Sequence, residues 1–387
     1  MQHRLLMLTA LAALAVALLA GCPRLAPEPE PPAAEEPAEQ PTPEEAGGRL
    51  VEDAAPAPPA SGAAVAQAAA DDHVVLSREQ LEASVVVHGS WGSEEGQFGA
   101  IPGEGTYGPA LYDVNLSGAI VVWDDCGNRR VQAFDRDGGL LGTVDVPVPG
   151  IIAMTAGLAH EVFLTDGNIV LRADWQKGEY EHLGELPREF GGASGITAAW
   201  YAPGPAGGRT WRLFLQQRLP TLEYGQLWIQ AYTTDLTRVG GTPGFSPFAV
   251  VEPFGLYGIE QTAVHEDRGV VTLIRWNASE RLVRRTECVL PVRLPEKGGC
   301  RIIGVHHYPR NVCLLTYDAA TVQPNRVFVI APSGAICGEM CIPQDIPPAS
   351  VTHPDDRFRA DAVGNLYVSW ADPVKGYSIS RVPLPTE

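Results

Sequence analysis

The sequence is short of basic residues: 28 Lys and Arg stand against 46 Asp and Glu, giving a formal net charge of −18. Nucleic-acid affinity comes largely from Lys and Arg that displace counterions, so this deficit argues against a nucleic-acid partner. Beyond Ala20, no apolar run approaches the roughly 20 residues that a membrane-spanning helix needs. The sequence also lacks G-x-S-x-G, so nothing indicates the nucleophile elbow of a hydrolase.

Helical periodicity is nearly absent after residue 70. Short apolar runs of five to seven residues dominate there, separated by Gly, Pro, Asp and Asn. Runs of this length between turn-forming residues are typical of strands. We therefore expect an all-β domain over residues 71–387.

The N-terminus has the composition of an export signal. A basic start, Met1–Arg4, precedes the 16-residue apolar run Leu5–Ala20, which ends in small residues. Leu19-Ala20-Gly21-Cys22 resembles the lipobox of bacterial lipoproteins. The resemblance implies that residues 1–21 are removed and that Cys22 is acylated, which would anchor the protein in a membrane. The absence of Asp at position 23 implies sorting to the outer membrane. An ordinary secretory signal with a chance Cys is the alternative.

The segment after Cys22 has the composition of a tether. Pro23–Ala70 contains eleven prolines and nine carboxylates but no aromatic residue. Such a chain buries too little apolar surface to offset its ordering entropy, so we expect residues 22–70 to be disordered. At about 3.1 Å per residue it would reach at most roughly 150 Å.

Six cysteines lie in the expected β domain: Cys126, Cys288, Cys300, Cys313, Cys337 and Cys341. Export would place them where disulfides persist. The pairs Cys337/Cys341 and Cys288/Cys300 could each close locally, but spacing alone does not give connectivity. These spacings do not match a zinc site.

Six segments of the domain share a pattern of two consecutive β runs joined by a short turn, and they start about 40 to 60 residues apart. The segments are LYDVNLSGAIVVWDD, IIAMTAGLAHEVFLTDG, GITAAWYAPGPAGGRTWRLFLQQ, EQTAVHEDRGVVTLIRWN, RIIGVHHYPRNVCLLTYD and RFRADAVGNLYVSWAD. One or two further β runs follow each of them. Six four-stranded units predict a six-bladed β-propeller. A β-sandwich is the alternative, and it would leave the recurrence unexplained.

The first unit resembles an NHL repeat, whose pattern runs from G-x-x-G-x-F through G-x-[IV]-x-V-x-D to N-x-R-[IV]-x-x-F. The matching positions are Gly92, Gly96, Phe98, Gly118, Ile120, Val122, Asp125, Asn128, Arg130, Val131 and Phe134. One extra residue stands near Trp123-Asp124, and the last unit matches only the middle of the pattern. No helix is expected after these glycines, so a phosphate-binding loop is disfavoured. We expect Asn128 and Arg130 to tie the inter-strand loop together.

The two chain ends of the propeller should meet in one blade. Ser84–His88 forms a β run before the first unit, whereas the last unit, Phe358–Val382, supplies only three clear strands. We expect the N-terminal strand to complete the C-terminal blade and so to protect the sheet edges.

A ligand-binding rim is predicted where second strands end, because these ends meet on one face of a propeller. The candidates pair aromatic with polar side chains: Trp123, Asp125, Trp276, Asn277, Tyr317, Asp318, Trp370 and Asp372. Such pairs suit sugars and peptides. In the alternative, the Trp side chains fill gaps between blades and the Asp side chains cap turns.

A metal site is a weaker hypothesis. His160, His265 and His306-His307 occupy similar turns, and Glu260, Asn277, Asp318 and Asp372 could hold a divalent cation in the channel. By similarity to propeller lyases and lactonases, either set would imply an enzyme. No catalytic residue and no cofactor is assigned. We expect a membrane-anchored binding module for an envelope protein, peptide or glycan. A metal-dependent lactonase or lyase and a structural scaffold are the alternatives.

Overall fold

The computed structural model describes residues 74–102, 106–157, 159–187, 192–201, 210–218, 227–244, 250–252, 255–264, 268–277, 282–292, 294, 298–305, 311–318, 325–342, 346–347 and 357–385. All of them belong to the second of two units into which the chain divides, Gln67–Glu387. The predicted signal peptide, Cys22 and the tether lie outside the described residues. Within the described part, no helix is long and apolar enough to cross a membrane.

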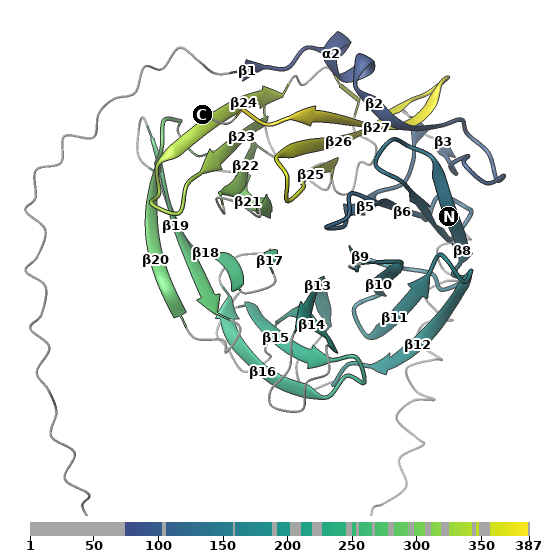
Figure 1. The fold of residues 1–387 in the computed structure, drawn as a ribbon, viewed down its shortest axis with the longest axis horizontal. Coiled ribbons are helices and arrows are strands. Elements are labelled where there is room, and N and C mark those ends of the chain that lie inside the picture. Colours follow the sequence, from purple (N-terminus) through teal and green to yellow (C-terminus); the bar gives the residue numbers. More distant parts are fainter. Residues whose placement is uncertain are drawn as a thin grey trace, which may run out of the picture. The chain divides into compact units, whose positions relative to one another are not determined.

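Six sheets, each with four antiparallel strands, form a ring, and the sheet of blade 5 carries a fifth, parallel strand; the predicted six-bladed propeller is confirmed (Figure 1). Blades 1 and 2 contain β5 (Leu111–Val114), β6 (Ile120–Asp124), β7 (Arg130–Phe134), β8 (Leu140–Asp145), β9 (Ala153–Ala156), β10 (Glu161–Thr165), β11 (Ile169–Asp174) and β12 (Glu179–Glu185). Blades 3 and 4 contain β13 (Ala193–Tyr201), β14 (Thr210–Arg218), β15 (Leu227–Thr233), β16 (Arg238–Gly244), β17 (Val250–Glu252), β18 (Gly255–Val264), β19 (Gly269–Asn277) and β20 (Leu282–Leu290). Blade 5 contains β21 (Gly298–Val305), β22 (Val312–Asp318), β23 (Asn325–Ile330) and β24 (Ile336–Ile342), and blade 6 has β25 (Phe358–Ala360), β26 (Asn365–Asp372) and β27 (Gly376–Pro383).

The apolar runs form blades because each sheet is covered on both faces. Side chains alternate between the two faces of a strand, and in β6 every residue is buried. Ile120 and Val122 pack at the interface of blades 6 and 1, whereas Val121 and Trp123 pack between blades 1 and 2. A strand between two neighbouring blades is therefore a continuous apolar run in the sequence. Among the described residues, separate apolar cores lie at five of the blade interfaces.

The N-terminal strand closes the ring, as predicted. β2 (Val85–Gly89) pairs antiparallel with β27 as the outermost strand of blade 6, in a register that sets His88 opposite Ser378. Val87 is fully buried at the blade 6/1 interface. The two ends of the propeller thus meet in one sheet.

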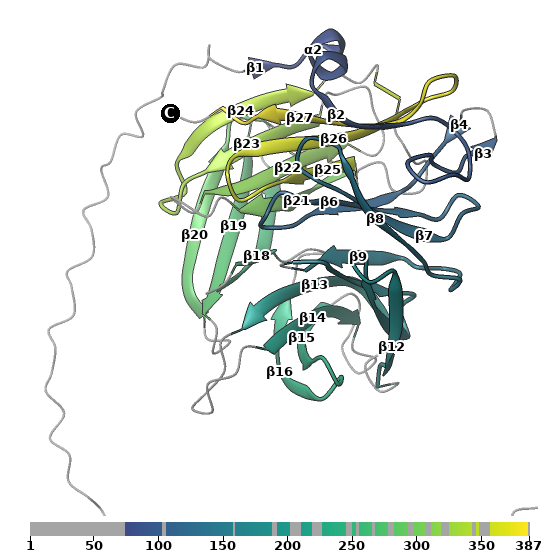
Figure 2. The ribbon, with the colours of Figure 1, turned by 45° about the vertical axis from the view of Figure 1, so that its right-hand side comes forward.

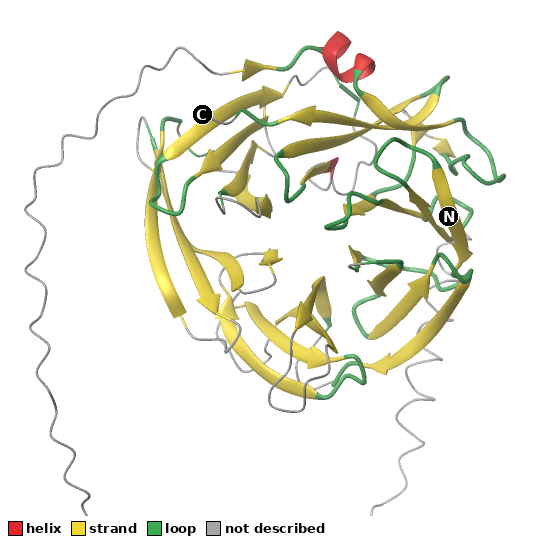
Figure 3. Cartoon of the chain, viewed as in Figure 1, coloured by secondary structure: helices red, strands yellow, loops and turns green. Residues whose placement is uncertain are grey.

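A second N-terminal contact was not predicted. β1 (Val74–Val75) pairs in parallel with β24 of blade 5, and helix α2 (Arg78–Ala83) follows it (Figures 1–3). Ser77 caps the helix through a reciprocal bond with Gln80, which satisfies N–H groups that the first turn leaves free. Leu76 and Leu81 are buried in the blade 5/6 interface. The segment before β2 therefore spans two blades.

Blade 4 differs from the prediction in one strand. Its innermost strand is the three-residue β17, which was missed, so the predicted pair of strands is the second and third of the blade, β18 and β19. Trp276 and Asn277 end β19. They therefore lie on the opposite face of the ring from the ends of the second strands, and the assumption that they join the rim is wrong.

The cysteine prediction also needs correction. Cys337 and Cys341 lie on the same strand, β24, four residues apart, which is about 13 Å in an extended chain. Disulfides need Cα atoms within about 7 Å, so this pair does not close while β24 is intact. Cys288 and Cys300 are free thiols buried in the blade 4/5 core. Burial raises the pKa of each of these two thiols to about 12.

Candidate binding surfaces

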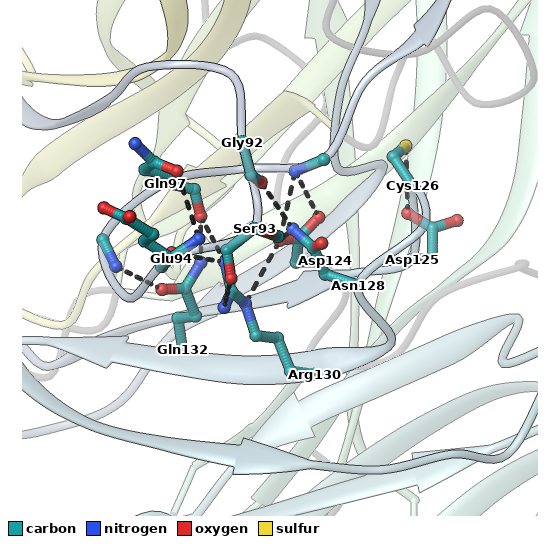
Figure 4. Close-up of polar contacts among 12 residues, drawn as sticks. Gly92, Ser93, Glu94, Gln97, Asp124, Asp125, Cys126, Asn128, Arg130 and Gln132 are labelled. Carbon is teal, nitrogen blue, oxygen red and sulfur yellow. Dashed lines mark hydrogen bonds and ion pairs between the residues drawn. The ribbon is translucent and has the colours of Figure 1, made fainter.

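A cluster of polar side chains surrounds Asp124, at the end of β6 (Figure 4). Its carboxylate is fully buried. One oxygen accepts from the Gly99 N–H at 3.0 Å, and the other accepts from Asn128 Nδ2 at 2.7 Å and lies 3.5 Å from Arg130 Nε. Burial raises the pKa of Asp124, and these contacts oppose the shift. The carboxylate is thus surrounded by protein donors.

Arg130 and its neighbours capture the chain that enters blade 1. The guanidinium donates to the carbonyls of Ser93, Glu94 and Gln97 at 2.7–2.8 Å. Gln132, two residues further along β7, exchanges hydrogen bonds with Gly96 N–H and the Gln97 carbonyl, and Asn128 donates to the Gly92 carbonyl.

These residues, Asp124, Asn128, Arg130 and Gln132, form what we call the clamp. The sequence predicted a structural role for Asn128 and Arg130, but in the inter-strand loop. They instead hold the segment Gly92–Gln97 that precedes blade 1. Gly99 is required in this arrangement, because a Cβ there would lie 2.0 Å from the Cys126 carbonyl oxygen.

The structure separates the aromatic residues of the predicted rim from its carboxylates. Trp123 is buried between blades 1 and 2, and Trp370 is buried between blades 5 and 6, where its Nε1 donates to Ser380 Oγ. Both positions match the alternative in which Trp fills space between blades.

The carboxylates of the rim remain at the surface. Asp125 is exposed in the turn after β6. Asp372 accepts from the N–H groups of Val374 and Lys375, which lowers its pKa and caps the β26–β27 turn. Trp91, which the sequence analysis overlooked, donates from Nε1 to the Asp372 carbonyl. The side chains of Tyr317, Asp318, Trp276 and Asn277 lie outside the described residues.

His160 has a local partner. Its Nε2 lies 3.2 Å from Asp174 Oδ2, which also contacts Lys177 Nζ at 2.9 Å. Burial acts to raise the pKa of Asp174, but the bonds from Lys177 and the nearby His160 outweigh it and lower that pKa. His265, His306, His307 and the Glu260 side chain lie outside the described residues. Among the residues described, no three His, Cys, Asp or Glu side chains lie close enough to hold a metal ion.

The innermost strands use their polar groups to join blades. Asp113 on β5 accepts from the Ala156 N–H and from Thr155 Oγ1 of blade 2, and lies 3.8 Å from Arg359 Nε of blade 6. Tyr112 donates to a carbonyl of blade 6, that of Tyr367, at 2.8 Å. These contacts align three blades around the channel.

An open groove of about 990 Å³ lies between β8 of blade 1 and β12 of blade 2. These two strands run along the outside of the ring (Figure 1). Sequence analysis did not find it, because its walls come from three segments far apart in the chain. The groove is lined by Glu94, Glu95, Thr143, Asp145, Glu179 and Tyr180, with Arg130 at its base. Its four carboxylates are exposed, so a strongly acidic concave surface faces solvent.

Comparison with known proteins supplies no family. No protein-family model and no curated protein matches the chain. Solved structures that are similar include the C-terminal WD40 domain of Sif2, at 12% identity, covering 73% of this chain and 84% of that one, with a TM-score of 0.39. The propeller domain of the Trilobed protease from Pyrococcus furiosus, described as having an open velcro topology, is similar at 8% identity, 74% and 85% coverage and a TM-score of 0.38. The fold assignment rests on the sheet topology itself.

Proposed function

We propose that this protein is a membrane-anchored envelope lipoprotein whose propeller binds another protein. The observation that carries the proposal is a contrast between the polar groups inside the propeller and those on its outer surface. The polar side chains of the clamp and of Asp113 bond other parts of the propeller. In contrast, four carboxylates of the groove between β8 and β12 are exposed to solvent. A concave surface with unpaired polar groups suits recognition better than it suits structure.

The anchor is proposed from the sequence. Acylation of Cys22 and a disordered tether over residues 22–70 would hold the propeller near a membrane, proposed here to be the outer membrane. The first described strand, β1, joins the ring at the edge of blade 5. A tether that arrives there would leave the opposite side of the ring, at blade 2, free for a partner.

Two finer assignments are part of the proposal. The first blade is proposed to be an NHL-type repeat, on the strength of its Gly, Asn and Arg positions. The predicted rim stays a prediction for Tyr317 and Asp318, and for the exposed Asp125 and the half-buried Asp372, with a peptide or glycan as its ligand.

Crosslinking the full-length chain in its native envelope, followed by mass spectrometry of the purified adducts, tests the binding role. The matched control keeps residues 1–70 and replaces the propeller by an inert domain. We expect at least one envelope protein to be captured by the full chain and not by the control. Identical adducts from both chains would contradict the proposal.

The anchor has its own test. We expect Cys22→Ser to shift the protein from the membrane fraction to the soluble fraction, because the acyl chains supply the membrane affinity. Retention of the Ser variant in the membrane fraction would contradict acylation at Cys22.

A further inference from the structure

We propose that the groove between β8 and β12 binds an extended segment of the partner protein that contains Lys or Arg. This inference rests on the proposed protein-binding function and names the chemistry of the partner. Figure 1 shows β8 and β12 following one another along the outside of the ring.

The charge of the groove selects a cationic ligand. Glu94, Glu95, Asp145 and Glu179 are all exposed. The basic side chain of the lining, Arg130, is only 5% exposed, and its guanidinium already holds three carbonyls and contacts Asp124. An acidic segment would be repelled, and a Lys or Arg side chain would gain charge-assisted hydrogen bonds.

The sheet edges favour an extended ligand. β8 and β12 are the outermost strands of their blades, and among the described strands each pairs with a single neighbour. The outer backbone groups of an edge strand are a template for pairing with a further chain. Residues Glu179–His182 at the start of β12 are all exposed. A segment lying in the groove therefore reaches both the outer edge of a strand and the carboxylates.

Tyr180 supplies the apolar part of the surface. Its side chain is 41% exposed in the groove lining. Lys and Arg bury their methylene stems on apolar surface while their charged ends stay in water, and a cation over a Tyr ring gains further attraction. An aromatic ring next to carboxylates thus matches both halves of a basic side chain.

One wall of the groove is held in place before any ligand arrives. The Ser93 and Glu94 carbonyls accept from Arg130, and the Glu94 N–H donates to Gln97 Oε1. A wall that is already ordered lowers the entropy cost of binding. The clamp of blade 1 thus also positions the Glu94-Glu95 carboxylates.

Fluorescence anisotropy of the purified chain with a labelled decapeptide of alternating Arg and Ser tests the inference. The test variant is Glu95→Gln/Glu179→Gln. The control, Glu79→Gln/Glu287→Gln, removes the same charge from exposed carboxylates of α2 and β20, away from the groove. We expect about tenfold weaker binding for the test variant, equivalent to about 1.4 kcal/mol, and less than a twofold change for the control.

Two further measurements keep the test decisive. Binding should weaken as ionic strength rises, because exposed charges are screened, and Tyr180→Ala should weaken it at constant charge. Equal weakening in the test and control variants, or equal binding of a Glu/Ser decapeptide, would overturn the inference. If the envelope crosslinks persist in the test variant, the groove is wrong but the protein-binding function stands. If the full chain yields no adduct beyond the control, the function itself fails.

Discussion

The two interfaces beside blade 6 are built from different chemistry. Among the described residues, the blade 6/1 interface has nine buried apolar side chains, of which five are aromatic, and the clamp lies beside it. The blade 5/6 interface has sixteen, of which two are aromatic, and it is covered by Leu76 and Leu81 from the N-terminal segment. The N-terminal chain thus seals one interface by directed hydrogen bonds and the other by burial of aliphatic surface.

The two interfaces therefore stabilise the ring in different ways. Hydrogen bonds at the 6/1 interface mainly fix the position of the chain, whereas aliphatic burial at the 5/6 interface mainly lowers the free energy of the folded state. Hydrogen bonds to the carbonyls of Ser93, Glu94 and Gln97 fix where the entering chain lies, because each bond depends on direction as well as distance. Aliphatic burial contributes roughly 25 cal/mol per Å² and tolerates swaps of similar volume. We therefore expect single substitutions to act more sharply at the clamp than at the aliphatic interface.

The largest effect is expected for Arg130→Ala. The change removes the Arg130 donor from three carbonyls, of which those of Glu94 and Gln97 each keep a second donor. It also leaves Asp124 buried without its cation, and breaking a buried pair in this way costs about 3–5 kcal/mol. Urea unfolding measures the loss, and hydrogen exchange should show faster exchange in residues 92–97. Arg78→Ala is the control, because its ion pair with Glu82 is exposed and such pairs contribute at most about 1 kcal/mol. Equal losses for the two variants would contradict the role of the clamp.

Leu81→Ala tests the aliphatic side of the comparison. Leu81 is 1% exposed and packs into the blade 5/6 core. Leu→Ala changes in cores cost about 2–5 kcal/mol, and we expect about 2–3 kcal/mol here because a six-residue helix at the edge can shift toward the gap. Thermal and urea unfolding measure it against Val75→Ala, whose side chain is 60% exposed. A loss below about 1 kcal/mol would mean that α2 adds little to ring closure.

The same contrast explains what the sequence could predict. The clamp needs particular polar residues at particular positions, so Asn128 and Arg130 stand out as a motif. Helix α2 buries one leucine, and β1 has two residues, so neither produces a periodic pattern. The blade count followed from recurring turns and from strands buried on both faces, as in β6.

The errors in blade 4 and at the groove have equally local causes. β17 has three residues and is followed after two residues by β18, so it does not stand out as a separate strand. The groove joins carboxylates at positions 94, 95, 145 and 179. The clamp places residues 94 and 95, and the course of β8 and β12 around the ring brings residues 145 and 179 beside them. No spacing in the sequence encodes this arrangement.

The smallest effect is expected for Asp124→Asn. The prediction concerns the direction in which the stability of this variant, relative to the parent chain, changes with pH. Burial raises the pKa of Asp124, so the folded state holds this proton more tightly than the unfolded chain does. The contribution of this shift to the free energy of unfolding is then fully present below the pKa of Asp124 in the unfolded chain, about 3.9. It is lost as pH rises through the pKa of Asp124 in the folded state. Asn does not ionise, so the stability of the variant relative to the parent chain should improve as pH rises from about 4.

Asp135→Asn is the matched control for this measurement. Bonds from the Gly139 and Asp137 N–H groups lower the pKa of Asp135, so its contribution is present above the unfolded pKa and is lost as pH falls through the folded one. The control variant should therefore lose stability relative to the parent as pH rises, the opposite sign to Asp124→Asn. If Asp124→Asn follows the control instead, the Arg130 charge outweighs burial, and the clamp would stabilise the ring as an ion pair as well as a set of directed bonds.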